Sequence, residues 1–265
     1  MFHAYVETWK LFRDLTDERS RLSTCVASVL DRRWLARRNV PWALIDVGCG
    51  DGALAREVVS RIAPGARPQQ VELVDPLWPV CDRATWPSPD CDKVRQLQID
   101  ARAFGQLYSS GPPSVLLLVH SAYYVDLADI AALMAYESVE SAVVVVNCRR
   151  SVFGDIWAIT RPDLLDRLEK LWRWVEQCDA ETLQVKASLS IPRCSLERIL
   201  GFLCLRDVGK LSRAERLAVE AVVAQHENCG RIEYAMDLLT LKLKRAAKQV
   251  PKALRSWRRP RFESQ

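Results

Sequence analysis

The chain has 265 residues, 49% of them hydrophobic, which is enough to bury the core of one large domain or of one domain with an insertion. No apolar run approaches the roughly 20 residues of a membrane-spanning helix, and the N-terminal residues lack a signal-peptide pattern, so we expect a cytoplasmic protein with no membrane partner. The net charge is +5, but nine of the 38 basic residues and only one of the 33 acidic residues follow Thr240, so the body is not a polycation.

Two helices are predicted within residues 4–31, before the first strand. Tyr5, Trp9 and Phe12 are spaced to lie on one helical face. The sequence Thr-Asp-Glu at residues 16–18 is typical of a cap between two helices. We expect residues 1–40 to form a helical cap on the rest of the chain.

The segment 43–53 reads ALIDVGCGDGA, an order that predicts a strand, a tight glycine turn and a helix. Glycines let the backbone turn sharply and approach a ligand, and the helix start offers free N–H groups. The spacing Gly-x-Gly-x-Gly differs from the dinucleotide fingerprint. It resembles motif I of the class I S-adenosylmethionine (SAM) methyltransferases. That resemblance implies cofactor contacts from Asp46, Gly48, Gly50 and Asp51.

Four further apolar runs follow in the order expected of a parallel sheet with alternating helices. The run 71–76 ends at Asp75, whose carboxylate can accept hydrogen bonds from two ribose hydroxyls. The run 94–101 ends in Asp100 and Ala101, and in methyltransferases an acidic and small pair at this place often meets the adenine. The runs 114–120 and 141–147 are continuously apolar, as strands buried on both faces are.

The second half of the chain predicts the end of the sheet and an insertion. We expect a helix within 161–178 with Asp163 as its cap, a strand at 181–191, two helices near 196–204 and 212–227, and a final antiparallel strand at 230–244 at the end of the sheet. The proline-rich segment 75–91 is predicted to be irregular. The insertion 192–229 could form a lid with the N-terminal helices.

These elements predict an α/β fold, a Rossmann-like class I methyltransferase with a seven-stranded, mostly parallel sheet, N-terminal helices and a helical lid insertion. The methyltransferase domain would span 41–245, and 246–265 would be a basic tail. A nucleotide-binding Rossmann domain with another chemistry is the alternative. None of the nine cysteines forms a CxxC pair, so we expect free thiols and no metal site. Cys148, after the fifth strand, is expected to serve packing.

The loop after the fourth strand, HSAYYVD at 120–126, is where acceptor chemistry is expected, because ligands bind outside the carboxyl ends of parallel strands. Its Tyr-Tyr pair, together with AYVETWKLFRDLTDE near the start, SVFGDIW after the fifth strand and ASLSIPRC before the insertion, resembles the histamine N-methyltransferase family. The resemblance implies N-methylation of a small nitrogen-containing molecule, aromatic or heterocyclic. It implies roles for Glu18 as the acceptor-binding glutamate, His120 in place of a glutamine, and Trp9, Tyr123, Tyr124 and Trp157 as aromatic walls.

This chain departs from that family at His120 and in the last strand, where Tyr234 and Ala235 stand near the position of an Asn-Asn pair. Histamine itself is therefore not the expected acceptor. Transfer of a methyl group from a sulfonium requires an aligned neutral nucleophile and a group that takes its proton. Histidine changes its charge between pH 5 and 8, so His120 is the candidate base, with Glu18 as the second catalytic residue.

Each assignment has a structural alternative. His120 could shape only the SAM pocket, Glu18 could serve as a helix cap, and the two tyrosines could be core aromatics. Two other functions also stay open: an RNA methyltransferase that uses the basic tail to bind nucleic acid, and a catalytically silent SAM-fold scaffold.

Overall fold

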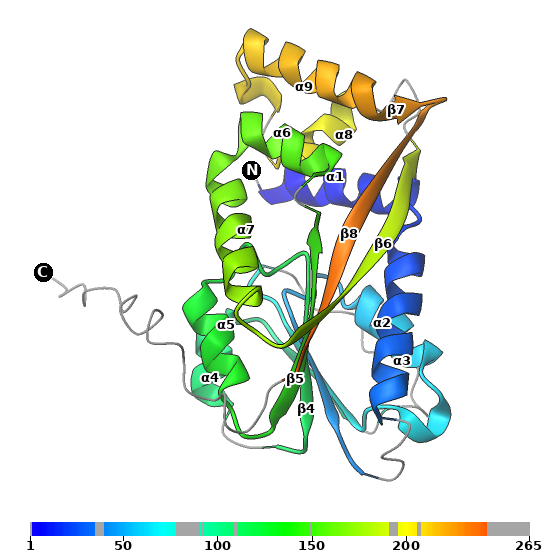
Figure 1. Cartoon of the computed structure of the whole chain (residues 1–265), viewed down its shortest axis with the longest axis vertical. Helices are drawn as coiled ribbons and strands as arrows, with labels where there is room; N and C mark the ends of the chain where they lie inside the picture. The colour runs from blue at the N-terminus through cyan, green and yellow to red at the C-terminus, as the bar shows by residue number, and fades with distance from the viewer. Residues whose placement is uncertain are drawn as a thin grey trace, which may run out of the picture.

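The computed structural model describes residues 2–34, 40–77, 91, 93–108, 111–148, 150–190, 196–205 and 208–242. A single mixed sheet stands between two layers of helices (Figure 1). Helices α2 (Glu18–Trp34) and α3 (Ala53–Arg61) cover one face. Helices α4 (Ala101–Leu107), α5 (Leu127–Met134) and α7 (Pro162–Val175) cover the other. This arrangement explains why the central strands are apolar throughout, since both of their faces are buried.

The strands follow the order β3-β2-β1-β4-β5-β8-β6, with the short β7 also paired to β8. The first five in this order are parallel, and β8 is antiparallel to both of its long neighbours. Their bounds are β1 Ala43–Val47, β2 Gln70–Val74, β3 Lys93–Leu97, β4 Ser114–Val119, β5 Val139–Asn147, β6 Ala180–Ser190, β7 Glu227–Asn228 and β8 Arg231–Lys242. The predicted α/β class and the mostly parallel sheet are confirmed.

Three local predictions were wrong. Strand β3 ends at Leu97, and Asp100 is instead the N-cap of α4, its carboxylate accepting a hydrogen bond from the Ala103 amide at 2.7 Å. Asp163 is not the cap of α7, because Pro162 already occupies the first turn and Arg161 is the N-cap residue. Strand β8 does not end the sheet, since β6 lies outside it.

The helical insertion and the N-terminal helix gather at the carboxyl ends of the parallel strands (Figure 1). Helices α1 (Phe2–Leu15), α6 (Val152–Thr160), α8 (Leu196–Leu203) and α9 (Arg213–His226) lie there, and we call this group the lid. Phe12 of α1 stacks on Phe202 of α8 with ring centroids 4.3 Å apart and meets Phe153 of α6 edge-on at 6.1 Å. Aromatic packing therefore holds the lid helices together.

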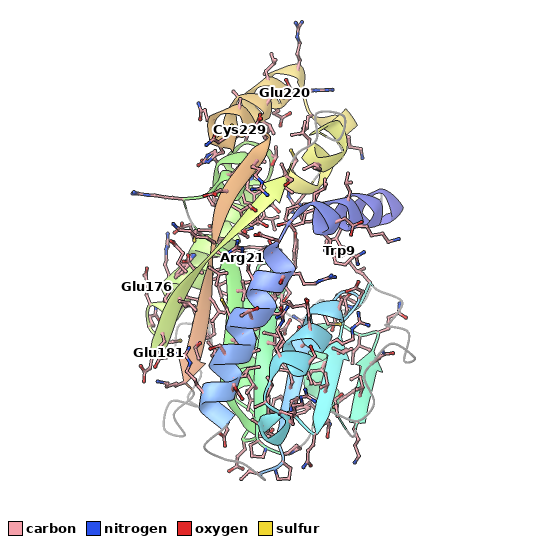
Figure 2. The ribbon with its side chains drawn as sticks, turned by 90° about the vertical axis from the view of Figure 1, so that its right-hand side faces the viewer. Trp9, Arg21, Glu176, Glu181, Glu220 and Cys229 are labelled. Atoms are coloured by element: carbon pink, nitrogen blue, oxygen red, sulfur yellow. The ribbon has the colours of Figure 1, made fainter. Side chains whose placement is uncertain are left out.

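Strands β6 and β8 form a long two-stranded ribbon that carries the insertion (Figure 2). The α9 helix begins with a capping box, in which Ser212 and Glu215 bond reciprocally to each other's amides. This cap explains why the sequence predicts the start of α9 so closely. The proline-rich segment after Leu77 and the basic tail 246–265 lie outside the described residues. In the part of the chain that the structure describes, no helix is long and apolar enough to cross a bilayer.

Candidate active site

The glycine turn after β1 has a backbone that only glycine adopts readily. Gly48, Gly50 and Gly52 have φ values of 74°, 56° and 67°, all in the left-handed region. A Cβ atom on Gly48 would lie 2.3 Å from Cβ of Ser121, so a side chain has no room there. Ser121 donates a hydrogen bond of 2.6 Å to the Val47 carbonyl. The turn after β1 and the loop after β4 are therefore packed directly against each other.

Gly50 and Asp75 form the next part of the site. The Gly50 amide donates to Oδ2 of Asp75 at 3.0 Å, and the Leu77 amide donates to Oδ1 at 2.9 Å. Among the described residues, no atom beyond its chain neighbours lies within 4 Å of the position that a Cβ on Gly50 would take. The turn therefore has open space beside a carboxylate, and each oxygen of that carboxylate can accept a second hydrogen bond. These residues fit a ribose that offers two hydroxyls.

Asp46, in β1, is 2% exposed. Burial, with a smaller contribution from the negative charge of Asp75, raises the pKa of Asp46 to about 8. Asp46 is therefore protonated at neutral pH. A cation close to it would favour the ionised form, as the sulfonium and amino groups of SAM would.

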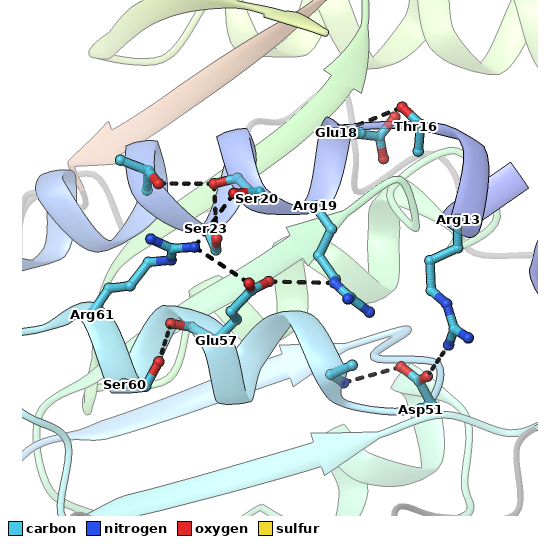
Figure 3. Close-up of polar contacts among 12 residues, drawn as sticks. Arg13, Thr16, Glu18, Arg19, Ser20, Ser23, Asp51, Glu57, Ser60 and Arg61 are labelled. Atoms are coloured by element: carbon cyan, nitrogen blue, oxygen red, sulfur yellow. Dashed lines mark hydrogen bonds and ion pairs between the residues drawn. The ribbon is translucent and has the colours of Figure 1, made fainter. Parts of the chain in front are cut away.

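Asp51 connects the glycine turn to the lid. Its Oδ1 accepts from the Ala53 amide at 3.0 Å and its Oδ2 from the Arg13 guanidinium at 2.9 Å (Figure 3). The Arg13 guanidinium also lies 5.0 Å from the centroid of the Trp9 ring on α1 (Figure 2). Both carboxylate oxygens of Asp51 thus have protein partners, and its contact with a cofactor stays a prediction.

Helices α2 and α3 are joined next to this turn. Arg19 of α2 and Arg61 of α3 both pair with Glu57, at 3.3 Å each (Figure 3). These partly exposed pairs contribute little stability individually, but they orient the helix that follows the turn. Asp100 and Ala101 cap and begin α4, as described above, and their contact with adenine stays a prediction.

His120 belongs to a series of four polar side chains, which come from the start of α2, the loop after β4, and β8. Its Nδ1 lies 3.0 Å from the Tyr123 hydroxyl, and its Nε2 lies 3.2 Å from Oε1 of Glu18. Oε2 of Glu18 accepts a hydrogen bond of 2.7 Å from the Tyr234 hydroxyl. We call these residues the Tyr123–His120–Glu18–Tyr234 chain. The structure thus brings together the two predicted catalytic residues, from the start of α2 and the loop after β4.

The charges along this chain follow from its surroundings. Burial acts to raise the pKa of Glu18, but the charge of His120 and hydrogen bonds from His120 and Tyr234 outweigh it, so that pKa is lowered and Glu18 is ionised. Burial and then the charge of Glu18 raise the pKa of Tyr234, so its hydroxyl keeps its proton and donates it. The ionised Glu18 carboxylate therefore lies directly beside Nε2 of His120.

The predicted aromatic walls are divided between core and surface. Tyr123 and Trp157 are 4% and 2% exposed, and their rings meet edge-on with centroids 5.2 Å apart. The Trp157 indole donates to the Leu203 carbonyl at 3.0 Å, so it packs inside the lid. Tyr124 is 45% exposed, and Trp9 contacts Arg13. A role for these four rings in holding an acceptor stays a prediction.

Sequence reasoning did not assign Tyr234 a role in the site. The only signal was its place in the last strand, where the resembling family differs. Cys148 follows β5, and burial, with a contribution from Asp237, raises the pKa of its thiol to about 12. A thiol that holds its proton so strongly is no nucleophile at neutral pH.

No protein-family model and no curated protein matches the chain. Among solved structures, the YcgJ protein of Bacillus subtilis is 11% identical, with 83% of this chain and 98% of that chain covered and a TM-score of 0.49. A putative methyltransferase from Bacillus halodurans C-125 is 12% identical (82% and 97% covered, TM-score 0.46). The plantazolicin methyltransferase BpumL, crystallised with SAH (S-adenosylhomocysteine), is 13% identical (90% and 90% covered, TM-score 0.45). Similarity at this level supports no conclusion on activity, and the Rossmann-like fold is assigned from the strand order described above.

Proposed function

We propose that this chain is a SAM-dependent methyltransferase that N-methylates a small, flat, nitrogen-containing molecule. The observation that carries the proposal is the meeting of two groups at one edge of the sheet. The glycine turn with Asp75 has the features of a SAM site. The Tyr123–His120–Glu18–Tyr234 chain supplies a base with an ionised partner beside it. Ser121, next to His120, packs on Gly48 and so holds the two groups together.

When bound, SAM supplies a methyl group on a sulfonium, which a nitrogen lone pair can displace in line. Asp75 would hold the ribose hydroxyls, and Asp46 would lie near the cationic end. Asp51 and the pair Asp100 and Ala101 would complete the cofactor site as predicted from the sequence. Low-dielectric surroundings strengthen each of these contacts.

His120 would take the proton that the acceptor nitrogen loses. Because Nε2 faces the ionised Glu18, it carries a hydrogen, and Nδ1 is left as the basic nitrogen. The proton reaches Nδ1 directly or through the Tyr123 hydroxyl, which lies 3.0 Å away. Glu18 stabilises the imidazolium that results, and Tyr234 holds Glu18 in place. Tyr124 and Trp9, which have exposed surface, are the aromatic side chains best placed to reach an acceptor.

The test is calorimetric titration of the full chain with SAH, followed by assays of SAH release from SAM with a panel of small amines and heterocycles. Asp75→Ala should weaken SAH binding by ~1.5–3 kcal/mol, the range for charge-assisted hydrogen bonds. Asp75→Asn should lose less, because an amide keeps one acceptor oxygen. Asp163→Ala, which removes an exposed carboxylate of α7, is the control and should bind normally. Unchanged affinity in Asp75→Ala would contradict the proposed cofactor site.

A further inference from the structure

Asn147 ends strand β5 with a buried polar atom that has no partner among the described residues. Asn147 is 3% exposed, and Oδ1 accepts no hydrogen bond from any described donor. Buried amide oxygens are almost always paired in folded proteins, because an orphaned one loses its hydration without compensation. Ligands bind at the carboxyl ends of parallel strands, so a bound molecule could donate the hydrogen bond that Oδ1 lacks.

The strand pairing places Asn147 on the face of the sheet that carries the candidate site. Asn147 is paired with Met236 of β8, and directly paired residues point to the same face. Side chains alternate along a strand, so Tyr234 shares the face of Met236. The hydroxyl of Tyr234 binds Glu18, which identifies this face as that of the Tyr123–His120–Glu18–Tyr234 chain.

A backbone contact shows that Asn147 lies near the loop that begins at His120. The His120 amide donates to the Val145 carbonyl at 3.0 Å, so the loop that begins at His120 runs beside the last residues of β5. Asn147 follows two residues later, on the face of Val145.

The strand register also relates Asn147 to Asp46, on the proposed cofactor side. Asp46 pairs with Leu117, which pairs with Val143. Asp46 and Asn147 therefore point to the same face, on either side of β4.

We propose that Asn147 determines acceptor specificity, with Oδ1 accepting a hydrogen bond from an N–H group of the molecule that is methylated. This rests on the proposed function and narrows its substrate class to nitrogen compounds that keep an N–H beside the reacting nitrogen. A molecule of the same shape without that N–H would leave Oδ1 orphaned, and buried polar groups discriminate strongly against such analogues.

The probes are pyrazole and isoxazole, two flat rings of nearly equal size. Isoxazole has an oxygen where pyrazole has its N–H group. Each is titrated into the SAH-loaded full chain and followed by NMR chemical shifts. The wild type should bind pyrazole about tenfold more tightly than isoxazole, the value of one net hydrogen bond. Asn147→Leu should lose this preference, and Asn147→Asp, which keeps the acceptor oxygen, should retain it.

Ser141→Ala is the matched control. Ser141 lies at the opposite end of β5, is 1% exposed, and its Oγ also lacks a partner among the described residues. The Ser141→Ala variant should keep the preference for pyrazole, because a buried polar atom at that end of the strand does not contact the ligand. Failure of the wild type to prefer pyrazole, or persistence of the preference in Asn147→Leu, would overturn the proposal. SAH affinity is measured first. A wild type that does not bind SAH would contradict the proposed function rather than the role of Asn147.

Discussion

Nε2 of His120 lies 3.2 Å from Oε1 of Glu18, a contact that joins the loop after β4 to the first turn of α2. Nδ1 of the same ring is held by the Tyr123 hydroxyl. The imidazole is thus oriented by a carboxylate on one side and a hydroxyl on the other, as a base that must take up a proton in one direction requires.

The first prediction concerns this pair. His120→Asn should keep SAH affinity within a few-fold but lower turnover by ~100-fold or more, the usual contribution of a general base. It should also flatten the acid limb of the pH–rate curve between pH 5 and 8. Glu18→Gln should also lower turnover, because it removes the carboxylate that lies 3.2 Å from Nε2 and orients the imidazole. The measurement is the initial rate of SAH formation across this pH range.

His226→Asn is the control for this experiment, since His226 is a described histidine that pairs with Asp155 within the lid, 2.9 Å away. Its pH–rate curve should match that of the wild type. A His120→Asn enzyme with the wild-type curve would show that His120 has only an architectural role.

The second prediction concerns Asp46, whose pKa is raised to about 8 from an ordinary value of 3.8. Between these two values the folded state holds a proton that the unfolded state has lost, so stability falls as pH rises from about 4 to about 8. Asp46→Asn should remove most of this slope. Asp75→Asn should end the slope at a lower pH, because it removes the neighbouring charge. Urea unfolding at several pH values measures how the free energy of unfolding depends on pH. Equal slopes in the wild type and Asp46→Asn would show that Asp46 is not the group responsible.

The third prediction compares two glycines of one turn. Gly50→Ala places a methyl group where no described residue crowds it, so its stability cost should be the ~1–2 kcal/mol of a left-handed non-glycine residue. Gly48→Ala adds a contact with Ser121 and should cost roughly 3 kcal/mol or more. Because the open space beside Gly50 is the proposed cofactor space, Gly50→Ala should lose SAH affinity disproportionately. Thermal unfolding measures the stability of each variant, and calorimetry measures its affinity for SAH. Equal destabilisation by Gly48→Ala and Gly50→Ala would contradict the described packing of Gly48 on Ser121.

The fourth prediction concerns the basic tail, which lies outside the described residues. Removal of residues 246–265 should leave SAH binding and methyl transfer to small amines unchanged, because the elements of the candidate site all precede it. The measurement is binding of a structured RNA by full-length and truncated chains across salt concentrations. Each phosphate contact adds to the slope of affinity against salt. Tight, steeply salt-dependent binding that vanishes on truncation would favour an RNA methyltransferase.

Much of the fold was predictable because the sheet is encoded locally. Continuous apolar runs that alternate with helical patterns give β1, β2, β4 and β5 within a few residues, and the acids near the ends of β1 and β2, Asp46 and Asp75, mark the ligand edge. The errors occurred where one polar residue could serve two local structures. Asp100 was assigned to the end of a strand, although aspartate is depleted in strands and favoured as an N-cap.

The site was predictable only in part, since its contacts join residues distant in sequence. Tyr234 and Glu18 are separated by 216 positions and Arg13 and Asp51 by 38, and no local pattern announces either pair. The burial of Trp157 likewise follows from how α8 docks on α6, which places the Leu203 carbonyl against the indole. Tertiary packing decides such details.

The two-stranded ribbon of β6 and β8 has a consequence for how this architecture can diversify. The insertion that it carries joins strands already paired along their whole length, so its helices can change in sequence or size without altering the register of the sheet. The glycine turn and Asp75 lie on a separate, earlier part of the chain. Evolution can therefore vary the lid above the strand ends, and with it the molecules admitted, while the proposed cofactor-binding half stays unchanged.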